Sequence, residues 1–287
     1  MAADPSAPPE LSAPPELSEY VRSVNGIELH VTEAGSGAPL LMLHGVGVDA
    51  SAQRREIEAL AGSHRVIAPD LRGHGRSTRP AAFSLRDHVD DMIGLLDELG
   101  LAQTAVLGGS MGSYVAQALA LAVPQRVREL ILVVATSHGR TSSTDRVLAE
   151  HADELRGLSR EQQQQWLSDR LFAPQTPSSV RDQVRDWYVS RYSLGLALSP
   201  DQIEAANKAV LGFDFRADLA TLEIPTLLIS GRHDILNPPA EAERMARLLP
   251  SARLEVFEHS GHLPSLEEPE RFDSTVLAFL AEHPAVS

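Results

Sequence analysis

Ser110 is the residue whose surroundings point most directly to covalent chemistry. It stands at the centre of Gly-Gly-Ser-Met-Gly at positions 108–112, between the apolar run 104–107 and residues 114–120, which predict a helix. A strand, a glycine-flanked serine and a helix in this order are typical of a nucleophile elbow, a sharp turn that presents the serine hydroxyl. The flanking glycines keep the strand and the helix from colliding. Because a helix N-terminus favours developing negative charge, Ser110 is the candidate nucleophile.

A serine hydroxyl needs a base within hydrogen-bond reach, and that base needs a third group to orient it. Asp234 follows the predicted strand 226–229, and His262 follows the predicted strand 253–257. All three candidates therefore stand at the carboxyl ends of predicted strands, where open α/β sheets bind their ligands. Because a long segment separates Ser110 from Asp234, the fold must carry an insertion before the acid.

Other ionisable residues offer alternatives for the base and the acid. They are His259 and His233 for the base, and Asp214 and Asp218 for the acid. Four further ionisable residues lie so close together in the sequence that they could be taken for catalytic residues. They are Asp70, Arg72, His74 and Arg76. We expect this group to hold a loop beneath the site through hydrogen bonds and ion pairs, and Ser113 to pack behind the elbow.

Composition narrows the class of protein. The 287 residues carry a formal net charge of −14, which argues against nucleic acid and an anionic membrane as partners. The chain has no cysteine, so disulfides, a thiolate nucleophile and a cysteine-ligated zinc site are excluded. No apolar run approaches the roughly 20 residues that span a bilayer, and the N-terminus lacks a signal-peptide pattern, so we expect a cytoplasmic protein.

Two classes of cofactor site are disfavoured. The sequence has eleven histidines, but they form no recognisable metal-binding motif. The two that lie close together, His259 and His262, are an isolated pair without further ligands nearby in sequence. No Gly-x-Gly-x-x-Gly opens a helix after the first buried strand, which argues against a dinucleotide site. We therefore expect a small-molecule substrate, no metal and no cofactor.

The chain begins with a proline-rich segment. Residues 1–18 contain Ala-Pro-Pro-Glu-Leu-Ser twice, and such acidic, Pro-rich sequence predicts a disordered tail. A polyproline II docking peptide is the alternative interpretation of this segment. We expect ordered structure to begin at about Tyr20. The dipeptide Asn25-Gly26 then predicts a hairpin turn between strands at residues 21–24 and 27–31.

Strands and helices then alternate along the chain. The predicted strands are 40–43, 65–68, 104–107, 130–134, 226–229 and 253–257, and the predicted helices are 50–61, 84–99, 240–249 and 269–281. Ser84 and Asp87 predict a capping box at the start of the second helix, and Gly100 predicts its end. Apolar strands alternating with amphipathic helices predict an α/β fold, a mostly parallel sheet with helices on both faces.

Residues 136–211 interrupt this alternation with polar, helical segments and no convincing buried strand. We expect most of their aromatic residues to form the small core of a helical insertion, with one or two over the serine. The candidates for a substrate pocket are Trp166, Leu171, Phe172, Trp187, Tyr188 and Tyr192. An insertion at this place can exclude water and select the substrate.

From about Tyr20 to the end, the chain resembles the α/β-hydrolase superfamily, in the serine-nucleophile branch that includes carboxylesterases and enol-lactonases. The matching segments are His-Gly-Val-Gly at 44–47, Asp-Leu-Arg-Gly-His-Gly-Arg-Ser at 70–77, the elbow, Gly231 to Asp234, and Ser-Gly-His at 260–262. The resemblance implies a hydrolase core over 19–135 and 212–287, with a helical cap over 136–211.

The resemblance also assigns roles to individual residues. It implies Ser110 as nucleophile, His262 as general base and then acid, and Asp234 as the group that orients His262. The backbone N–H groups of Val46 and Met111 would form the oxyanion hole, and His44 would support the oxyanion loop.

These roles predict a cofactor-free serine hydrolase that cleaves a small-to-medium, apolar carboxylic ester or lactone through an acyl-enzyme. A carbon–carbon bond hydrolase and a haloperoxidase-like enzyme of the same fold are alternatives, because fold does not settle substrate. A ligand receptor that retains the triad is the alternative outside enzymes.

Overall fold

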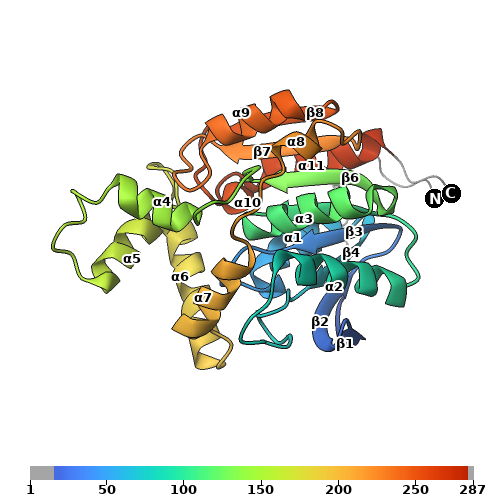
Figure 1. The fold of residues 1–287 in the computed structure, drawn as a ribbon, viewed down its shortest axis with the longest axis horizontal. Helices are drawn as coiled ribbons and strands as arrows, with labels where there is room; N and C mark the ends of the chain where they lie inside the picture. Colours follow the sequence, from blue (N-terminus) through green and yellow to red (C-terminus); the bar gives the residue numbers. More distant parts are fainter. Residues whose placement is uncertain (1–15, 284–287) are drawn as a thin grey trace, which may run out of the picture.

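A sheet of eight strands organises residues 16–283, the part of the chain that the computed structural model describes. The strands are β1 (Leu17–Val24), β2 (Ile27–Ala34), β3 (Ala38–Leu43), β4 (His64–Pro69), β5 (Thr104–Gly109), β6 (Val127–Val133), β7 (Thr226–Gly231) and β8 (Ala252–Phe257). They lie in the order β1-β2-β4-β3-β5-β6-β7-β8 (Figure 1). β2 is antiparallel to both of its neighbours, and the strands from β4 to β8 across the sheet are parallel. The predicted mostly parallel α/β sheet is confirmed.

The β1–β2 hairpin corrects the predicted end of the tail. Asn25 and Gly26 adopt φ of 45° and 75°, as a tight hairpin turn requires. The strand begins at Leu17, so the prediction that residues 17 and 18 belong to the tail is wrong. Leu17 is opposite Ala34, and the Ser18 hydroxyl donates a hydrogen bond to the Glu33 carbonyl at 3.2 Å. Residues 1–15 of the predicted tail lie outside the described part of the chain.

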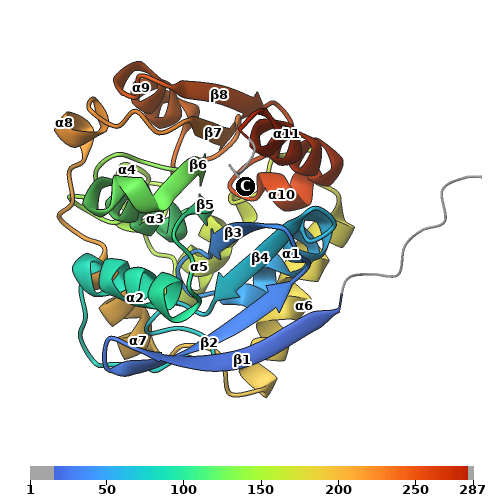
Figure 2. The same ribbon diagram turned by 90° about the vertical axis from the view of Figure 1, so that its right-hand side faces the viewer.

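Helices cover both faces of the sheet. They are α1 (Arg54–Leu60) and α11 (Pro269–Glu282) on one face, and α2 (Leu85–Glu98), α3 (Met111–Ala122) and α9 (Pro239–Leu248) on the other (Figure 2). The two faces of β3 contribute to two separate cores: Leu41 packs with α2 and α3, whereas Leu40 packs with α1 and α11. Strands buried on both faces explain the continuous apolar runs of the sequence.

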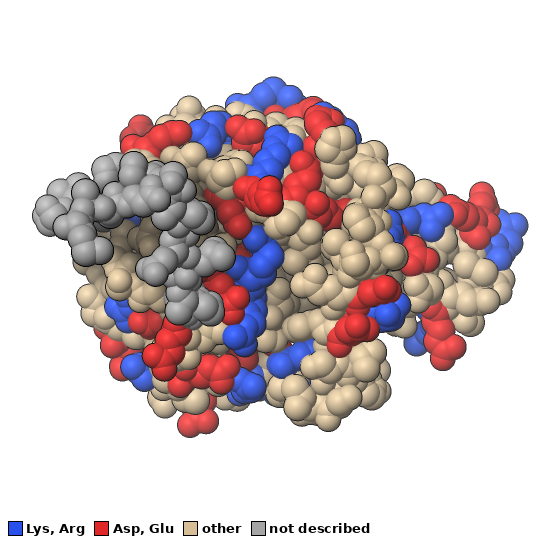
Figure 3. All heavy atoms as spheres, turned by 180° about the vertical axis from the view of Figure 1, so that it is seen from behind, with Lys and Arg blue, Asp and Glu red and all other residues tan. Residues whose placement is uncertain are grey.

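The predicted capping box is present at the start of α2. The Ser84 hydroxyl accepts from the Asp87 N–H, and the Asp87 carboxylate accepts from the Ser84 N–H. The helix ends where Gly100 takes φ of 66°, a conformation that costs glycine little. On the face shown in Figure 3, basic and acidic side chains are interspersed.

Five helices lie between β6 and β7, of which the last, α8 (Arg216–Leu219), directly precedes β7 and the other four lie within residues 136–211. These four are α4 (Ser143–Glu150), α5 (Arg160–Asp169), α6 (Ser178–Ser193) and α7 (Pro200–Ala209). They gather beyond the carboxyl ends of the strands, on the left of Figure 1. As predicted, residues 136–211 contain no strand of the sheet. None of the helices between residues 16 and 283 combines the length and apolar character needed to cross a membrane.

The aromatic residues of this helical segment do not share one core. Trp166 packs with Val147 and Leu155 in a small cluster, as expected of a helical insertion. Tyr188 and Tyr192 are 47% and 81% exposed, so the prediction that most of the aromatics form the small core is wrong. These two side chains line a cavity against residues 47–49 instead of joining the cluster around Trp166.

Candidate active site

Ser110 occupies a strained turn between β5 and α3. Its backbone has φ of 51° and ψ of −118°, which is rare for a residue with a side chain. The Ser110 N–H donates to the Val133 carbonyl at 3.0 Å, and the Ser113 N–H and hydroxyl both donate to the Ser110 carbonyl. Ser113 therefore packs behind the turn, as predicted. These contacts hold the strained turn with the Ser110 hydroxyl free to face the site.

Glycines make the turn possible. A Cβ atom at Gly108 would overlap the backbone of Gly112, and one at Gly112 would overlap the Leu43 carbonyl. Both positions therefore need glycine because β5, β3 and α3 approach each other without room for a side chain. This is the steric reason for the spacing seen in the sequence.

The structure brings Ser110, His262 and Asp234 together. Nε2 of His262 lies 3.1 Å from the Ser110 Oγ, and Nδ1 lies 2.8 Å from the Asp234 Oδ2. The Asp234 side chain is fully buried and that of His262 is 9% exposed. A carboxylate accepts at Nδ1, which leaves Nε2 as the acceptor for the serine proton. The arrangement can remove a proton from Ser110 and return it.

Backbone amides hold the Asp234 carboxylate in place. Its Oδ1 accepts from the Leu236 N–H at 2.8 Å and from the Asn237 N–H at 3.1 Å. Because both bonds use Oδ1, Oδ2 remains directed at His262. β7 and the turn after it thus fix the acid, and the loop after β8 carries the histidine.

The alternative bases and acids lie elsewhere. Between residues 16 and 283, none of the four hydrogen-bonds to Ser110 or His262. His259 is exposed and lies beside Gln175, while Asp214 pairs with Arg216, whose hydrogen bonds lower the pKa of the Asp214 carboxyl. His233 is partly exposed in its loop, and the Asp218 carbonyl caps a turn at Thr221. These positions do not support a catalytic assignment.

Val46, in the loop after β3, and Met111, at the start of α3, line the same cavity as Ser110. His44 braces this loop. Its Nδ1 bonds the Gly45 carbonyl at 2.7 Å, and its Nε2 accepts from the Leu71 N–H at 2.9 Å. Burial lowers the pKa of His44, so the ring stays neutral and keeps Nε2 as an acceptor.

The charged segment 70–76 holds the loops beneath the site, as predicted. The Asp70 carboxylate accepts from the Ala50 N–H at 2.9 Å and the Arg76 N–H at 2.8 Å. Burial raises the pKa of Asp70, but its hydrogen bonds, first among them the one from His30, outweigh burial and lower it. Burial lowers the pKa of His74 to about 3, so this histidine is a neutral packing residue.

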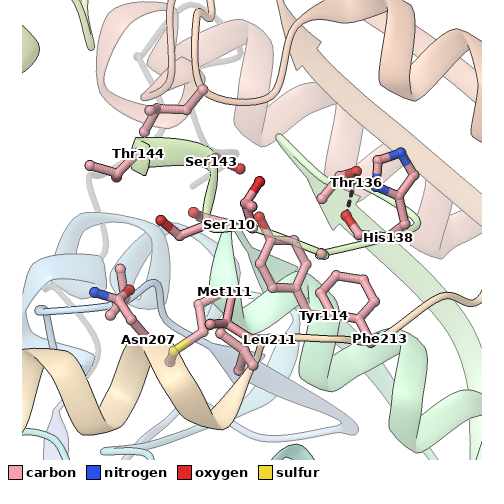
Figure 4. Close-up of a pocket in the computed structure, with 16 residues that line it drawn as sticks. Ser110, Met111, Tyr114, Thr136, His138, Ser143, Thr144, Asn207, Leu211 and Phe213 are labelled. Carbon is pink, nitrogen blue, oxygen red and sulfur yellow. Dashed lines mark hydrogen bonds between the residues drawn. The ribbon is translucent and has the colours of Figure 1, made fainter. Parts of the chain in front are cut away.

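The cavity at Ser110 has a volume of about 60 Å³ and a mixed lining. Ser110, Ser143 and Thr136 contribute hydroxyl groups to this lining, and Leu211 and Phe213 contribute apolar side chains (Figure 4). The lining comes from α3, from the residues after β6 and from α7 and the residues after it. Polar and apolar side chains therefore both surround the reactive hydroxyl.

None of the six residues predicted to line the pocket lines this cavity. Trp187, Tyr188 and Tyr192 instead line a second cavity of about 220 Å³ against residues 47–49. The Trp187 indole donates to the Ser51 hydroxyl at 3.0 Å, which places this face of α6 over the loop after β3.

The other three predicted residues also lie away from the cavity. Trp166 belongs to the small core of the helical segment, and Phe172 is buried under Arg181. Leu171 contacts the histidine loop through its backbone, because its carbonyl accepts from the His262 N–H at 2.6 Å. The pocket prediction is wrong because the aromatic side chains pack outside the space above Ser110.

Sequence reasoning missed several residues of the site. Tyr114 lies one helical turn after Ser110 on α3 and lines the cavity, a spacing that the sequence does show. Asn237 links Tyr114 to the Val134 carbonyl, with distances of 3.1 Å and 2.6 Å from its Nδ2. In the sequence, the only indication of this role is that Asn237 lies three residues after Asp234. Glu267, five residues after His262, carried no signal without the fold.

No three His, Asp or Glu side chains within residues 16–283 are grouped to hold a metal ion. The sequence of this chain matches the model of a known protein family. A family model described as the alpha/beta hydrolase fold matches residues 38–269.

The chain belongs to the alpha/beta hydrolase family.

Relatives within this hydrolase family differ in the reactions that their names give. The chain is 32% identical over 255 residues to a pimeloyl-[acyl-carrier protein] methyl ester esterase of Nitrosomonas europaea, covering 86% of this chain and 97% of the relative. It is 32% identical over 290 residues to a 2-hydroxymuconate semialdehyde hydrolase of Pseudomonas sp. strain CF600, covering 96% and 99%. A solved thermophilic esterase from Thermogutta terrifontis is 29% identical with a TM-score of 0.77, covering 94% and 100%.

Proposed function

We propose that this hydrolase cleaves a small carboxylic ester or lactone through an acyl-enzyme on Ser110. The observation that carries the proposal is the chain of two hydrogen bonds, 3.1 Å from Ser110 Oγ to His262 Nε2 and 2.8 Å from His262 Nδ1 to Asp234 Oδ2. Esterase relatives over most of the chain support the ester as substrate class. The helical segment 136–211 serves in this proposal as the cap over the site.

Each residue then has one task in the reaction. His262 takes the proton from Ser110 as its oxygen attacks the substrate carbonyl carbon, and Asp234 stabilises the imidazolium that forms. The backbone N–H groups of Val46 and Met111 bind the oxyanion, a role that is typically worth about 2.7–4 kcal/mol for each donor. The imidazolium protonates the leaving alcohol, and its C–O bond breaks. A water that His262 deprotonates then attacks the acyl carbon, and release of the acid restores Ser110.

The size of the Ser110 cavity supports a short acyl group. A cavity of about 150 Å³ holds benzene, whereas the space at Ser110 is about 60 Å³. An aromatic acyl group would therefore need α7 and the residues after β6 to move apart. The Thr136 and Ser143 hydroxyls donate to the His138 carbonyl and to Asn237, so their remaining lone pairs favour a substrate that carries a hydrogen-bond donor near the scissile bond. This refines the apolar substrate predicted from sequence.

A carbon–carbon bond hydrolase is the second candidate. The relative named as a 2-hydroxymuconate semialdehyde hydrolase aligns with 96% of this chain at 32% identity, about as similar as the esterase relative. The same serine and histidine can serve both reactions, so the substrate must discriminate them.

The test is steady-state hydrolysis of a panel of acetyl, butyryl and benzoyl esters, small lactones and a vinylogous diketone acid, for wild type beside Ser110→Ala. We expect multiple turnovers, highest on acetyl esters or small lactones, and loss of turnover in the variant. Turnover of the diketone alone would move the assignment to carbon–carbon cleavage. Binding of a panel member without turnover would favour a receptor that retains the triad.

A further inference from the structure

Glu267 sits at the end of α10 (Pro264–Glu267), next to the loop that carries His262. Its Oε2 accepts from the Gly261 N–H at 2.8 Å and from the Leu263 N–H at 3.3 Å. These are the two residues on either side of the histidine. One carboxylate oxygen therefore fixes the main chain just before and just after the side chain that must reach Ser110.

The other oxygen of Glu267 binds the helical segment between β6 and β7. Oε1 accepts from the Ala173 N–H at 2.7 Å and from the Thr176 hydroxyl. The same segment contacts the loop directly, because the Leu171 carbonyl accepts from the His262 N–H at 2.6 Å. Glu267 and Leu171 thus tie the His262 loop to residues 171–176.

The loop that carries His262 packs tightly against two neighbouring segments. A Cβ at Gly261 would overlap the Leu171 carbonyl, and a Cβ at Gly231 would overlap the Gly261 carbonyl. The loop is therefore clamped between the end of β7 and residues 171–173. The neighbouring Glu268 binds the His259 N–H and the Ser260 hydroxyl, so it holds the part of the loop before Gly261. Only Glu267 holds the N–H groups that flank His262, among the side chains of residues 16–283.

A small displacement of this loop has a large consequence for catalysis. The His262 ring must keep both Ser110 and Asp234 within hydrogen-bond distance, at 3.1 and 2.8 Å. A shift of about 1 Å in a catalytic group can cost about 100-fold in rate. Buried amide donors that lose their acceptor force such a rearrangement, because unpaired N–H groups are costly.

We infer that Glu267 is a positioning residue for His262 and couples residues 171–176 to the catalytic loop. The inference rests on the proposed function, in which His262 activates Ser110. Movement of the helical segment on substrate binding thereby reaches the histidine through the Glu267 carboxylate as well as through the Leu171 carbonyl. Glu267 itself does not touch the reacting atoms.

The experiment measures how fast a small fluorophosphonate labels Ser110, in wild type, Glu267→Gln, Glu267→Asp and the control Glu270→Gln. Glutamine at 267 turns an NH₂ group toward one pair of N–H or O–H donors, so half of the network loses its acceptor. Glu270 has the same charge, lies in the neighbouring helix and is exposed. A small phosphonate reports activation of Ser110 by His262 and needs little contact with the helical segment.

We expect Glu267→Gln to lower the labelling rate about 10- to 100-fold and kcat in parallel, with a much smaller change in KM. Glu267→Asp keeps the charge and both acceptors and should restore part of the rate, while Glu270→Gln should match wild type. Hydrogen exchange should also accelerate at residues 171–176 and 261–263 in Glu267→Gln alone. Wild-type labelling in a folded Glu267→Gln variant would overturn the inference.

Failure of a variant to fold and failure of the wild-type protein to be labelled are distinguished from a wild-type labelling rate in Glu267→Gln. If Glu267→Gln does not fold, Glu267→Asp decides: a reduced labelling rate supports the inference, and a wild-type rate overturns it. If the wild-type protein is not labelled at Ser110, the proposed function fails first, whatever the variants do. A fall in stability without a fall in the labelling rate would make Glu267 a purely structural residue and would also overturn the inference.

Discussion

The side-chain amide of Asn237 holds Val134 in a left-handed backbone conformation. Its Nδ2 donates to the Val134 carbonyl at 2.6 Å, and Val134 has φ of 47°, which is costly for a β-branched residue. The same nitrogen lies 3.1 Å from the Tyr114 hydroxyl, and Oδ1 accepts from the Ser143 hydroxyl at 2.7 Å. One buried side chain therefore joins the end of β6 to α3 and α4.

This relationship predicts a large stability effect. Asn237→Ala would leave the Val134 carbonyl and the Tyr114 hydroxyl without their buried partner, so we expect the free energy of unfolding to fall by about 2–4 kcal/mol. Asn207→Ala is the control, since Asn207 lines the cavity but is only partly buried. Urea unfolding measures both, and equal, small losses for the two variants would contradict the role of Asn237.

The acid of the site should matter to rate more than to stability. Asp234→Asn retains the shape but changes which nitrogen of His262 carries the proton, so we expect kcat to fall by about four orders of magnitude. Asp214→Asn is the control, because Asp214 is exposed and pairs with Arg216. A mild effect at Asp234 together with a severe one at Asp214 would reverse the assignment.

Two buried histidines should make the protein sensitive to acid. Burial lowers the pKa of His74 and of His88 to about 3. In the unfolded chain histidine has a pKa of about 6.5, so between about pH 6.5 and 3 the unfolded state binds protons that the folded state does not. Stability therefore rises with pH in this window and is lost as the pH falls through it. The two residues together contribute a slope of up to about 2.7 kcal/mol per pH unit.

His88→Leu tests this pH dependence. Both ring nitrogens of His88 are buried without a hydrogen-bond partner within residues 16–283, so leucine removes no hydrogen bond there. Urea unfolding at pH 8 should change little, whereas between pH 4 and 6 the slope of stability with pH should decrease by up to about 1.4 kcal/mol per unit. An unchanged slope would show that His88 is not neutral in the folded protein.

A buried ion pair joins the loop after β3 to α6. The Arg191 guanidinium binds the Asp49 carboxylate, and their side chains are only 7% and 4% exposed. Arg191→Met leaves Asp49 buried without its partner, so we expect a loss of about 3–5 kcal/mol in the free energy of unfolding. The double variant Arg191→Met/Asp49→Asn should recover part of it, because asparagine removes the buried charge and keeps an acceptor for the Ser51 N–H.

The control for this pair lies on the same helix. Arg185 pairs with Asp182 at the surface, where both side chains are well exposed. Arg185→Met should therefore leave unfolding in urea nearly unchanged, because exposed ion pairs contribute little. If the two methionine variants lose equal stability, the contact between α6 and the loop after β3 is not a determinant of folding.

The sequence was sufficient for the core of the fold and for the proposed triad positions. The Asn25-Gly26 turn, the capping box at Ser84 and the glycines around Ser110 each impose a local geometry, so the strands and helices that they bound were predictable. Asp234 and His262 followed predicted strands, and parallel strands present such residues at one edge of the sheet.

The helical segment was not predictable in the same way. Which face of α6 meets the loop after β3 depends on contacts such as Trp187 with Ser51, which join residues far apart in sequence. Weak amphipathic patterning in polar helices leaves their orientation open, so the aromatic residues were assigned to the wrong cavity. Glu267 and Asn237 were missed for a similar reason, since their partners come from several different elements.

Trapping of the acyl-enzyme shows whether Ser110 carries the acyl group of the substrate during turnover. Wild type and Ser110→Ala are mixed with an activated acetyl ester, quenched in acid during the first turnovers, and measured as intact and protease-digested protein by mass spectrometry. We expect one acetyl group per wild-type chain, on the peptide that contains Ser110, and none in the variant. Unchanged turnover in Ser110→Ala, or an acetyl group that accumulates on a different residue in wild type and variant alike, would contradict the acyl-enzyme on Ser110.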